Sequence, residues 1–363
     1  MPSAKSFGTF VRFDGPGRPQ TAVRARLPAL RDGELLVRND YATLCRSDVT
    51  TWLGQRTEAT PTILGHEVVG HIAACGPSAP RTDLAGRELA VGHRITWAIY
   101  ASDPTTELSR LGMPQKAPGR CKYGHEPLRD DHGFHGGLAE YTVLRRHTPI
   151  VRLDAAIPAE VAAMTNCAVA TVAGALRLAG DVTGRTVLVS GVGALGVFAC
   201  AMAAQRGARV FAIDVDPVRA ERARSFGALD CFAAGDPRQL PRGDVVLECS
   251  GAPAAIERTM EQLELGGTAI WVGAVMPQRP VQIDAERVVR QLLTVRGLHN
   301  YIAADLATAA EFVTQQHTRY PFAQMVQGGF DLSSVDAAFH CAAEQRPLRV
   351  GVRTTAPATA ARR

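Results

Sequence analysis

A glycine-rich turn between a strand-like and a helix-like segment constrains the fold of this chain more than any other feature. The run Thr186–Ser190 is typical of a buried strand, and the spacing Gly-x-Gly-x-x-Gly follows it directly and opens the alanine-rich run Ala194–Gln205. The first glycine makes the tight turn, the second lets the backbone approach a pyrophosphate, and the third allows close helix–strand contact. Free N–H groups and the helix dipole favour the anion. The predicted dinucleotide contacts are Gly191, Gly193, Ala194, Leu195 and Gly196.

Strand and helix patterns alternate around this turn. Strand candidates are Thr186–Ser190, Arg209–Ile213, Asp244–Glu248 and Thr268–Val272, and helical candidates are Ala194–Gln205, Pro217–Phe226 and Ala254–Leu263. Strands that alternate with helices of this length form βαβ units and a parallel sheet covered on both faces. We therefore predict an α/β fold with a doubly wound, parallel, cofactor-binding domain.

The end of the next predicted strand carries the residue that selects the cofactor. Asp214 can accept hydrogen bonds from both ribose hydroxyls and would repel a 2′-phosphate, so we predict NAD rather than NADP. Arg219 complicates this prediction because a guanidinium can accommodate the extra phosphate. Gly251 and the Val272-Gly273 turn follow later strands and are expected to line the dinucleotide crevice.

The pattern of secondary-structure signals in the sequence changes along the chain. Up to about Ile150, short β-like runs are broken by Gly and Pro, which predicts an irregular, mostly antiparallel β domain. After about Thr294 the pattern becomes mixed again, and this tail is expected to return to the first domain. The predicted boundaries are 1–155 for the catalytic domain, 156–295 for the cofactor domain and 296–363 for the returning segment, with a frayed end over Thr354–Arg363.

Composition excludes several classes of protein. The net charge of +5 is scattered along the chain, whereas nucleic-acid binding needs clustered positive charge. No apolar stretch approaches the roughly 20 residues that span a bilayer, and the first residues lack the apolar core of a secretory signal. Eight cysteines in such a chain argue against a disulfide framework. We expect a cytoplasmic protein that binds neither nucleic acid nor membrane.

Three soft ligands suggest a metal site. Cys45, His66 and Cys167 form the N/S set that suits zinc, and catalytic zinc keeps three protein ligands and one open position. Asp48 is placed to orient the imidazole of His66. Glu67 adjoins His66 and could approach the metal when the open position changes its occupant.

Taken together, the motifs resemble those of the zinc-dependent medium-chain dehydrogenases, the alcohol dehydrogenase family. In family order, the chain has Cys45-Arg46-Ser47-Asp48, Gly65-His66-Glu67, Gly137-Leu138-Ala139-Glu140-Tyr141, Asn166-Cys167-Ala168 and the glycine turn. The resemblance covers nearly the whole chain. It implies a GroES-like, mostly β catalytic domain, a Rossmann domain, and an active site in the cleft. It also implies a homodimer or homotetramer, since relatives pair through their nucleotide domains.

The resemblance assigns roles to individual residues. It makes Cys45, His66 and Cys167 the zinc ligands, Glu67 their acidic partner, Ser47 the hydroxyl beside the bound alcohol, and Arg46 a candidate for the pyrophosphate. The expected reaction is reversible oxidation of an alcohol to an aldehyde or ketone. In it, zinc acts as a Lewis acid, Ser47 passes on the proton and the nicotinamide accepts the hydride.

Two departures from the family pattern matter. The family often carries a second, structural zinc on four cysteines, and the corresponding slots here are Asp103, Thr106, Ser109 and Ala117. Cys121 alone cannot build a four-ligand site, so we expect one zinc per chain and a lobe that is mobile or held by packing alone. Several relatives also end a proton relay with a histidine where this chain has Thr50.

The sequence constrains the substrate less than the reaction, and it leaves two alternative functions open. Pro114-Gln115-Lys116 together with Lys122-Tyr123-Gly124-His125 resembles a subgroup associated with phosphonate metabolism, which suggests a small phosphonate-bearing alcohol or aldehyde. Four basic residues that could receive an anionic group are interpreted as solvated surface charges: Arg110, Lys122, His125 and Arg296. One alternative is a zinc-free, NADPH-dependent enone or quinone reductase, which the intact ligand set disfavours. Another is a non-catalytic NAD-binding protein.

Overall fold

A computed structural model describes residues 7–129, 133–233, 236 and 238–355 and divides the chain into two compact units. The first unit comprises Met1–Cys167, Ile302–His317 and Phe322–Arg363, and the second comprises Ala168–Tyr301 and Thr318–Pro321. The first unit extends to Cys167, beyond the predicted boundary at residue 155, because helix α3 (Ala159–Met164) packs against two strands of that unit. Most of the predicted frayed end, residues 356–363, lies outside the described residues.

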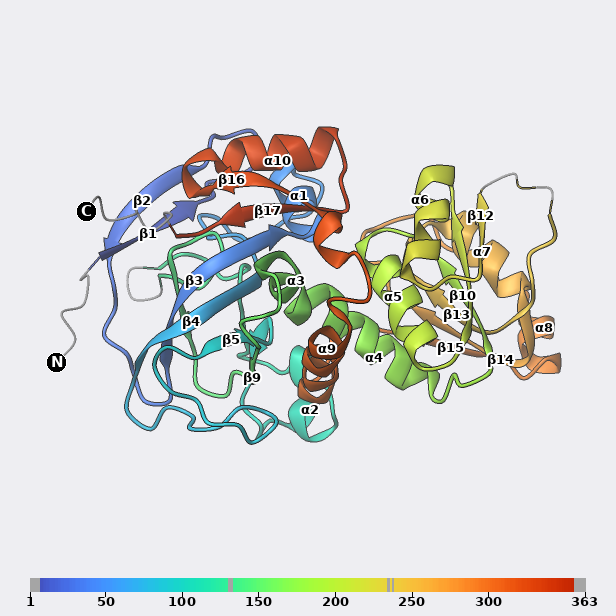
Figure 1. The fold of residues 1–363 in the computed structure, drawn as a ribbon, viewed down its shortest axis with the longest axis horizontal. Coiled ribbons are helices and arrows are strands. Elements are labelled where there is room, and N and C mark those ends of the chain that lie inside the picture. Colours follow the sequence, from blue (N-terminus) through green and yellow to red (C-terminus); the bar gives the residue numbers. More distant parts are fainter. Residues whose placement is uncertain (1–6, 130–132, 234–235, 237, 356–363) are drawn as a thin grey trace. The chain divides into compact units, whose positions relative to one another are not determined.

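The first unit is built on a seven-stranded sheet of order β16-β17-β3-β4-β5-β9, with β8 paired to β3. Its strands are β3 (Leu35–Leu44), β4 (Glu67–Cys75), β5 (Arg94–Trp97), β8 (Tyr141–Leu144), β9 (Ile150–Arg152), β16 (Val326–Asp331) and β17 (Arg349–Arg353). Central strands β3 and β4 are antiparallel and place Thr43 opposite Glu67. Strand β17 returns from the far end of the chain to lie beside β3 (Figure 1). The end of the chain therefore meets the segments that carry the predicted ligands.

The remaining elements of the first unit surround this sheet. They are β1 (Phe7–Arg12), β2 (Thr21–Arg26), α1 (Arg46–Trp52), β6 (Tyr100–Ala101), α2 (Glu107–Arg110), η1 (Pro114–Lys116), β7 (Cys121–Lys122), α3, η2 (Thr165–Val169), α9 (Ala303–Gln316), η4 (Phe322–Met325), η5 (Leu332–Ser334) and α10 (Val335–Glu344). A core with fully buried Val37, Ala42 and Trp97 holds the central strands.

The second unit is a six-stranded, wholly parallel sheet of order β12-β11-β10-β13-β14-β15. Its strands are β10 (Thr186–Ser190), β11 (Arg209–Asp214), β12 (Asp230–Ala233), β13 (Gly243–Glu248), β14 (Leu263–Trp271) and β15 (Thr294–Gly297). Its helices are α4 (Ala170–Ala179), α5 (Ala194–Gln205), α6 (Pro217–Arg222), η3 (Ala223–Phe226), α7 (Pro253–Glu261) and α8 (Ala285–Arg290). The predicted α/β class and parallel sheet are confirmed, and the outer strands β12 and β15 add to the predicted four.

The prediction that no apolar stretch is long enough to span a bilayer was wrong for one helix. In the part of the chain that the structure describes, the continuous helix Ala159–Ala179 is long and apolar enough to cross a bilayer. However, 83% of its apolar window is buried inside the protein, as in the core helix of a folded domain. Its interior also contains the π-helical turn η2 rather than the uninterrupted α-helix that the alanine-rich sequence predicts.

Candidate active site

Four potential ligands meet in the first unit. One ligand atom each of Cys45, His66, Glu67 and Cys167 lies within 4.8 Å of all the others. Cys45 follows β3 as the N-cap of α1, His66 directly precedes β4, Glu67 opens that strand, and Cys167 lies in η2. Three elements distant in sequence thus bring the predicted ligand set together.

Asp48 links the first two ligands. Its Oδ2 accepts the backbone N–H of Cys45 at 2.9 Å, which closes the capping box of α1. Its Oδ1 accepts the N–H of Gly65 at 3.2 Å and lies 3.3 Å from Nδ1 of His66. An outer carboxylate of this kind fixes the ring orientation and leaves Nε2 for a metal. The contact places Asp48 beside the imidazole of His66, where the sequence analysis expects it.

The π-turn positions the third ligand. Single π-turns inside α-helices occur frequently at functional sites because they shift side chains from the regular helical register. Cys167 lies in this turn, and the preceding residue, Asn166, donates from Nδ2 to the carbonyl oxygens of His66 and Trp97, each at 2.9 Å. The same turn therefore presents one ligand and holds the backbone of another.

Glu67 has a buried partner that the sequence analysis missed. Arg349, in β17, donates from Nε to Oε2 and from Nη2 to Oε1 of Glu67, both at 2.9 Å, and Thr43 donates to Oε2 at 2.6 Å. Nη2 of Arg349 also lies 3.9 Å from the sulfur of Cys45. A lone arginine in the apolar run Leu348–Val352 was the signal, since a buried charge needs a partner. With both oxygens engaged, Glu67 acts beside the ligand set, which leaves three ligands.

Shifted pKa values distribute the protons unequally over the donor atoms of the cluster. A hydrogen bond from Cys167 lowers the pKa of Cys45 well below its usual value, although burial opposes this, and Arg349 adds to the effect. The same hydrogen bond and burial raise the pKa of Cys167. Burial opposes the charged imidazole of His66, but Asp48 and Cys45 outweigh it and raise its pKa to about 10. A thiolate, together with a thiol and an imidazolium that can each lose a proton, supplies the donors that zinc takes, so these residues fit the metal.

Helix α1 also carries the residues assigned to the alcohol and the cofactor. Ser47 is half-buried in its first turn and Arg46 is exposed. Thr50, which stands where relatives have the histidine, is buried and donates its hydroxyl to the carbonyl of Ser47 at 3.0 Å. The Thr50 hydroxyl is thus bound to the backbone of its own helix.

In the second unit the glycine turn has the geometry that the motif requires. Gly191 has φ +85° and would place a side chain 2.7 Å from Ser250, whereas a Cβ on Gly193 would meet open space. Gly196, beside Ala194 and Leu195 in the first turn of α5, has no room for a side chain against Gly191. The second glycine is therefore the one that leaves space for a ligand.

Asp214 supports this turn from the end of β11. Its Oδ2 accepts the N–H of Val192 at 2.7 Å and its Oδ1 accepts that of Asp216 at 2.9 Å. Arg219, on α6, lies 3.6 Å from a carboxylate oxygen of Asp216. The carboxylate predicted to recognise the ribose thus also holds the backbone of the glycine turn.

Gly251 and the Val272-Gly273 turn, which are expected to line the dinucleotide crevice, lie at the ends of β13 and β14. Gly251 (φ +73°) packs so closely on Gly273 that neither has room for a side chain. The N–H groups of Val272 and Gly273 both donate to the carbonyl of Glu248, at 2.9 and 3.0 Å. Within the second unit, the ends of β13 and β14 are thereby joined.

The lobe, residues 100–120, is held by more than packing. Asp103 accepts hydrogen bonds from the N–H and the hydroxyl of Thr105, at 2.8 and 2.7 Å. Thr106 caps α2, and its hydroxyl lies 2.8 Å from that of Ser109. Ala117 is fully buried. The side chains in three of the four zinc slots therefore bond locally, which corrects the expectation that packing alone would hold the lobe.

Two basic residues interpreted as solvated surface charges are not. The side chain of His125 is 5% exposed, its ring centre lies 5.2 Å from that of His66, and its Nδ1 lies 2.8 Å from Glu58. Burial lowers the pKa of His125 to about 4 and that of Lys122 to about 8. Arg110 and Arg296 are exposed, as predicted.

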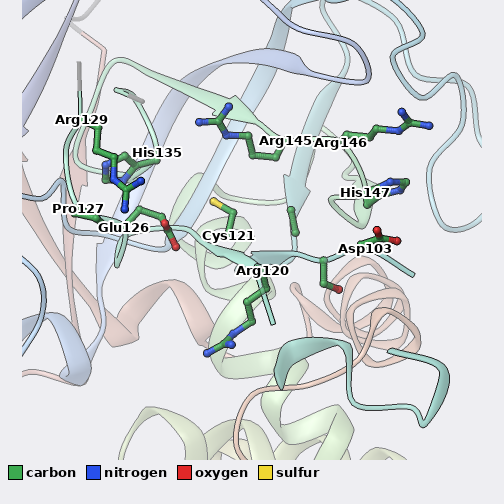
Figure 2. Close-up of a pocket in the computed structure, with 13 residues that line it drawn as sticks. Asp103, Arg120, Cys121, Glu126, Pro127, Arg129, His135, Arg145, Arg146 and His147 are labelled. Atoms are coloured by element: carbon green, nitrogen blue, oxygen red, sulfur yellow. The ribbon is translucent and has the colours of Figure 1, made fainter. Parts of the chain in front are cut away.

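A separate cavity of about 390 Å³ lies in the first unit (Figure 2). Its lining includes Cys121, Arg120, Arg129, His135 and Arg145, but none of the four clustered ligands. Arg145 is paired with Glu34 at 2.7 Å. Cys121 and Lys122 are neighbours in β7, and successive strand side chains point to opposite faces. Because Cys121 faces this cavity, Lys122 is directed away from it.

Comparison with known proteins supports the chemistry of the ligand set. The alcohol dehydrogenase GroES-like domain family matches residues 31–155, and the zinc-binding dehydrogenase family matches residues 194–315. The chain belongs to the zinc-dependent medium-chain dehydrogenases. It is an oxidoreductase that acts on CH–OH groups, and its family uses zinc and a nicotinamide cofactor.

Several relatives resemble the dehydrogenase over most of its length. It is 26% identical to an L-threonine 3-dehydrogenase of Sinorhizobium medicae over 339 residues, which cover 88% of each chain. An alcohol dehydrogenase of Thermotoga maritima has the same fold, with a TM-score of 0.86, 22% identity, and coverage of 96% of this chain and 99% of that one. A zinc-binding dehydrogenase of Sinorhizobium meliloti bound to NADP gives a TM-score of 0.82 at 22% identity, covering 96% and 100%.

Proposed function

We propose that this dehydrogenase reversibly oxidises a small alcohol to an aldehyde or ketone with NAD, using one zinc per chain. The observation that carries the proposal is the convergence of Cys45, His66 and Cys167 within a framework of oriented partners. A zinc ion held by these residues would polarise the substrate oxygen as a Lewis acid and favour loss of its proton. The zinc-free reductase alternative would leave this complete ligand set without a role.

The chain's own residues supply orientation and proton transfer. Asp48 holds the imidazole of His66, and Asn166 holds the backbone of the same residue. Ser47, two residues after the ligand Cys45, takes the alcohol proton. Because the Thr50 hydroxyl is bonded to the carbonyl of Ser47, the proton continues through water rather than through Thr50.

The cofactor proposal rests on Asp214. Its carboxylate ends β11 beside the glycine turn, where the motif places the ribose. One relative binds NADP, and Arg219 lies close to Asp216. Activity must therefore be measured with NADP as well as with NAD. We expect wild-type kcat/KM to be higher with NAD, and Asp214→Ala to narrow the difference. A wild-type preference for NADP would overturn the assignment.

The substrate is proposed to be a small alcohol or aldehyde that bears a phosphonate. Support comes from the resemblance of segments 114–116 and 122–125 and from the burial of Lys122 and His125 near His66. The similarity to L-threonine 3-dehydrogenases favours a carboxylate-bearing alcohol as the second candidate. A panel of phosphonate-, phosphate- and carboxylate-bearing alcohols with uncharged analogues, followed by NADH absorbance, tests both. No NADH from any alcohol would refute the proposed function.

We further propose that the enzyme is cytoplasmic, where the thiols of its ligand set stay reduced, and that it forms a homodimer or homotetramer. Strand β15 is an edge of the parallel sheet, and Val289, Leu292 and Val295 near it are 73%, 72% and 38% exposed. An apolar sheet edge invites pairing with a second strand. Light scattering should show an oligomer that Val295→Lys weakens. A monomeric wild type would contradict the assembly.

A further inference from the structure

The turn Lys122–His125 packs directly on the loop that carries a metal ligand. Gly124 has φ +75°, and a Cβ there would lie 2.5 Å from the carbonyl oxygen of Gly65 and 3.3 Å from the Cβ of His66. The N–H of His125 closes the turn on the carbonyl of Lys122 at 3.1 Å. The geometry brings the side chains of this turn to the edge of the metal cluster.

A second segment meets the turn there. Oε1 of Glu58 lies 2.8 Å from Nδ1 of His125 and 2.7 Å from Nη2 of Arg56. The carboxylate thus serves both the ring and the guanidinium. Within the described part of the chain, the Lys122 ammonium has neither a hydrogen bond nor an ion pair, although Arg56, Glu58 and Cys167 all act on its charge.

The charges at this edge do not cancel. Lys122, Arg56 and Arg120 bring three positive charges, and Glu58 and Glu126 bring two negative charges. Around the ligands, Arg349 neutralises Glu67, and the two cysteine thiolates would balance a divalent ion. Asp48, buried against His66, adds one negative charge within the cluster, so the excess positive charge is local to the edge formed by Lys122 and Arg56. Burial makes such a charge costly unless a negative partner joins it.

We propose that Lys122, with Arg56, forms a recognition subsite for an anionic oxygen group on the substrate alcohol. This inference rests on the proposed function and names its specificity-determining residue. The ligand chemistry is a carboxylate or a phosphonate or phosphate group on the same short molecule as the reacting hydroxyl. Glu58 and His125 position the subsite: the carboxylate holds Arg56 and the ring and leaves Lys122 to the substrate.

The test compares Lys122→Met with Lys122→Arg, which keeps the charge. The exposed Arg110→Met, which removes a charge from the lobe, is the matched control. For each protein, kcat/KM is measured with 2-hydroxyethylphosphonate, with L-threonine and with propan-1-ol. Charge-assisted hydrogen bonds predict that Lys122→Met loses about 10- to 100-fold on the better anionic substrate, mainly through KM, and changes less than about twofold on propan-1-ol. Lys122→Arg should restore most of the loss, and Arg110→Met should resemble wild type.

A binding readout independent of turnover accompanies the kinetics. Calorimetric titration with ethylphosphonate and with propionate should show that Lys122→Met weakens binding of the preferred anion by a similar factor, at unchanged zinc content. Equal losses on charged and uncharged alcohols, or unchanged anion binding, would overturn the subsite. If wild type oxidises propan-1-ol better than either anionic alcohol, the subsite fails while the proposed function stands. If wild type oxidises no alcohol, the function fails, and the titration still decides whether Lys122 binds an anion.

Discussion

The metal cluster and the lobe are two regions of one unit where the family pattern provides for zinc, and they have diverged in opposite ways. At the cluster, Cys45, His66 and Cys167 converge within a network of buried partners. In the lobe, Asp103, Thr106 and Ser109 stand in the ligand slots and make local hydrogen bonds. Hydrogen bonds and capping can replace a metal that only stabilises a loop. A metal that polarises a substrate oxygen has no such substitute, so we expect the two regions to respond differently to mutation.

The largest expected difference comes from removing a ligand. Cys45→Ala or Cys167→Ala should reduce bound zinc from about one per chain to about none and lower turnover by on the order of 10,000-fold or more. NADH binding, measured by fluorescence, should survive because the glycine turn belongs to the other unit. Thr106→Ala in the lobe is the control and should keep both zinc and activity.

Two results would break the comparison. Turnover by a folded, zinc-free Cys45 variant would remove the metal from the reaction. Two tightly held zinc ions in the wild type would show that the lobe binds metal through other residues. Circular dichroism of each variant separates these results from simple unfolding.

The next effect concerns the proton. Ser47→Ala should lower turnover by about 100- to 10,000-fold, the usual contribution of a positioned acid–base group, and leave zinc bound. Thr50→His should add an ionisation near pH 6.5, about the ordinary pKa of histidine, to the pH–rate profile. A Ser47→Ala enzyme as active as wild type at every pH would show that the proton leaves by another route.

Metal affinity should depend on pH, in a direction fixed by the shifted pKa values. The pKa of His66 is raised to about 10 and that of Cys167 is also raised, so both residues carry protons near neutrality. Zinc must displace them. Binding should therefore release about two protons per ion, and affinity should rise by about 100-fold per pH unit below those pKa values. Chelator competition at several pH values and dye-detected proton release measure this, and pH-independent affinity would contradict the protonation assigned here.

The sequence predicts some regions of the structure better than others, and the reasons are physical. The parallel sheet follows from local patterns, and β10 and α5 have the predicted bounds because a buried strand, a glycine turn and a helix are neighbours in sequence. The ligand set was predictable from its motifs. The Arg349–Glu67 pair was not, because the two residues are brought together only when β17 returns to the sheet beside β3. The burial of His125 likewise depends on the contact of Gly124 with Gly65.

The smallest expected effect is the most direct test of how the lobe is held. Thr106 caps α2 by accepting the N–H of Ser109, and loss of a cap destabilises a helix end by about 0.5–2 kcal/mol. Because α2 is short and none of its residues is buried, the loss of stability in Thr106→Val should lie at the low end of this range. On roughly the same scale, that loss corresponds to a 2- to 5-fold decrease in amide protection. Hydrogen exchange over residues 103–117 measures this, with Thr106→Ser as the control that keeps the hydroxyl. Loss confined to the lobe would support hydrogen bonds in place of zinc. Unchanged protection would leave packing as the holding force, and loss that spreads to the metal ligands would show that the two regions are coupled.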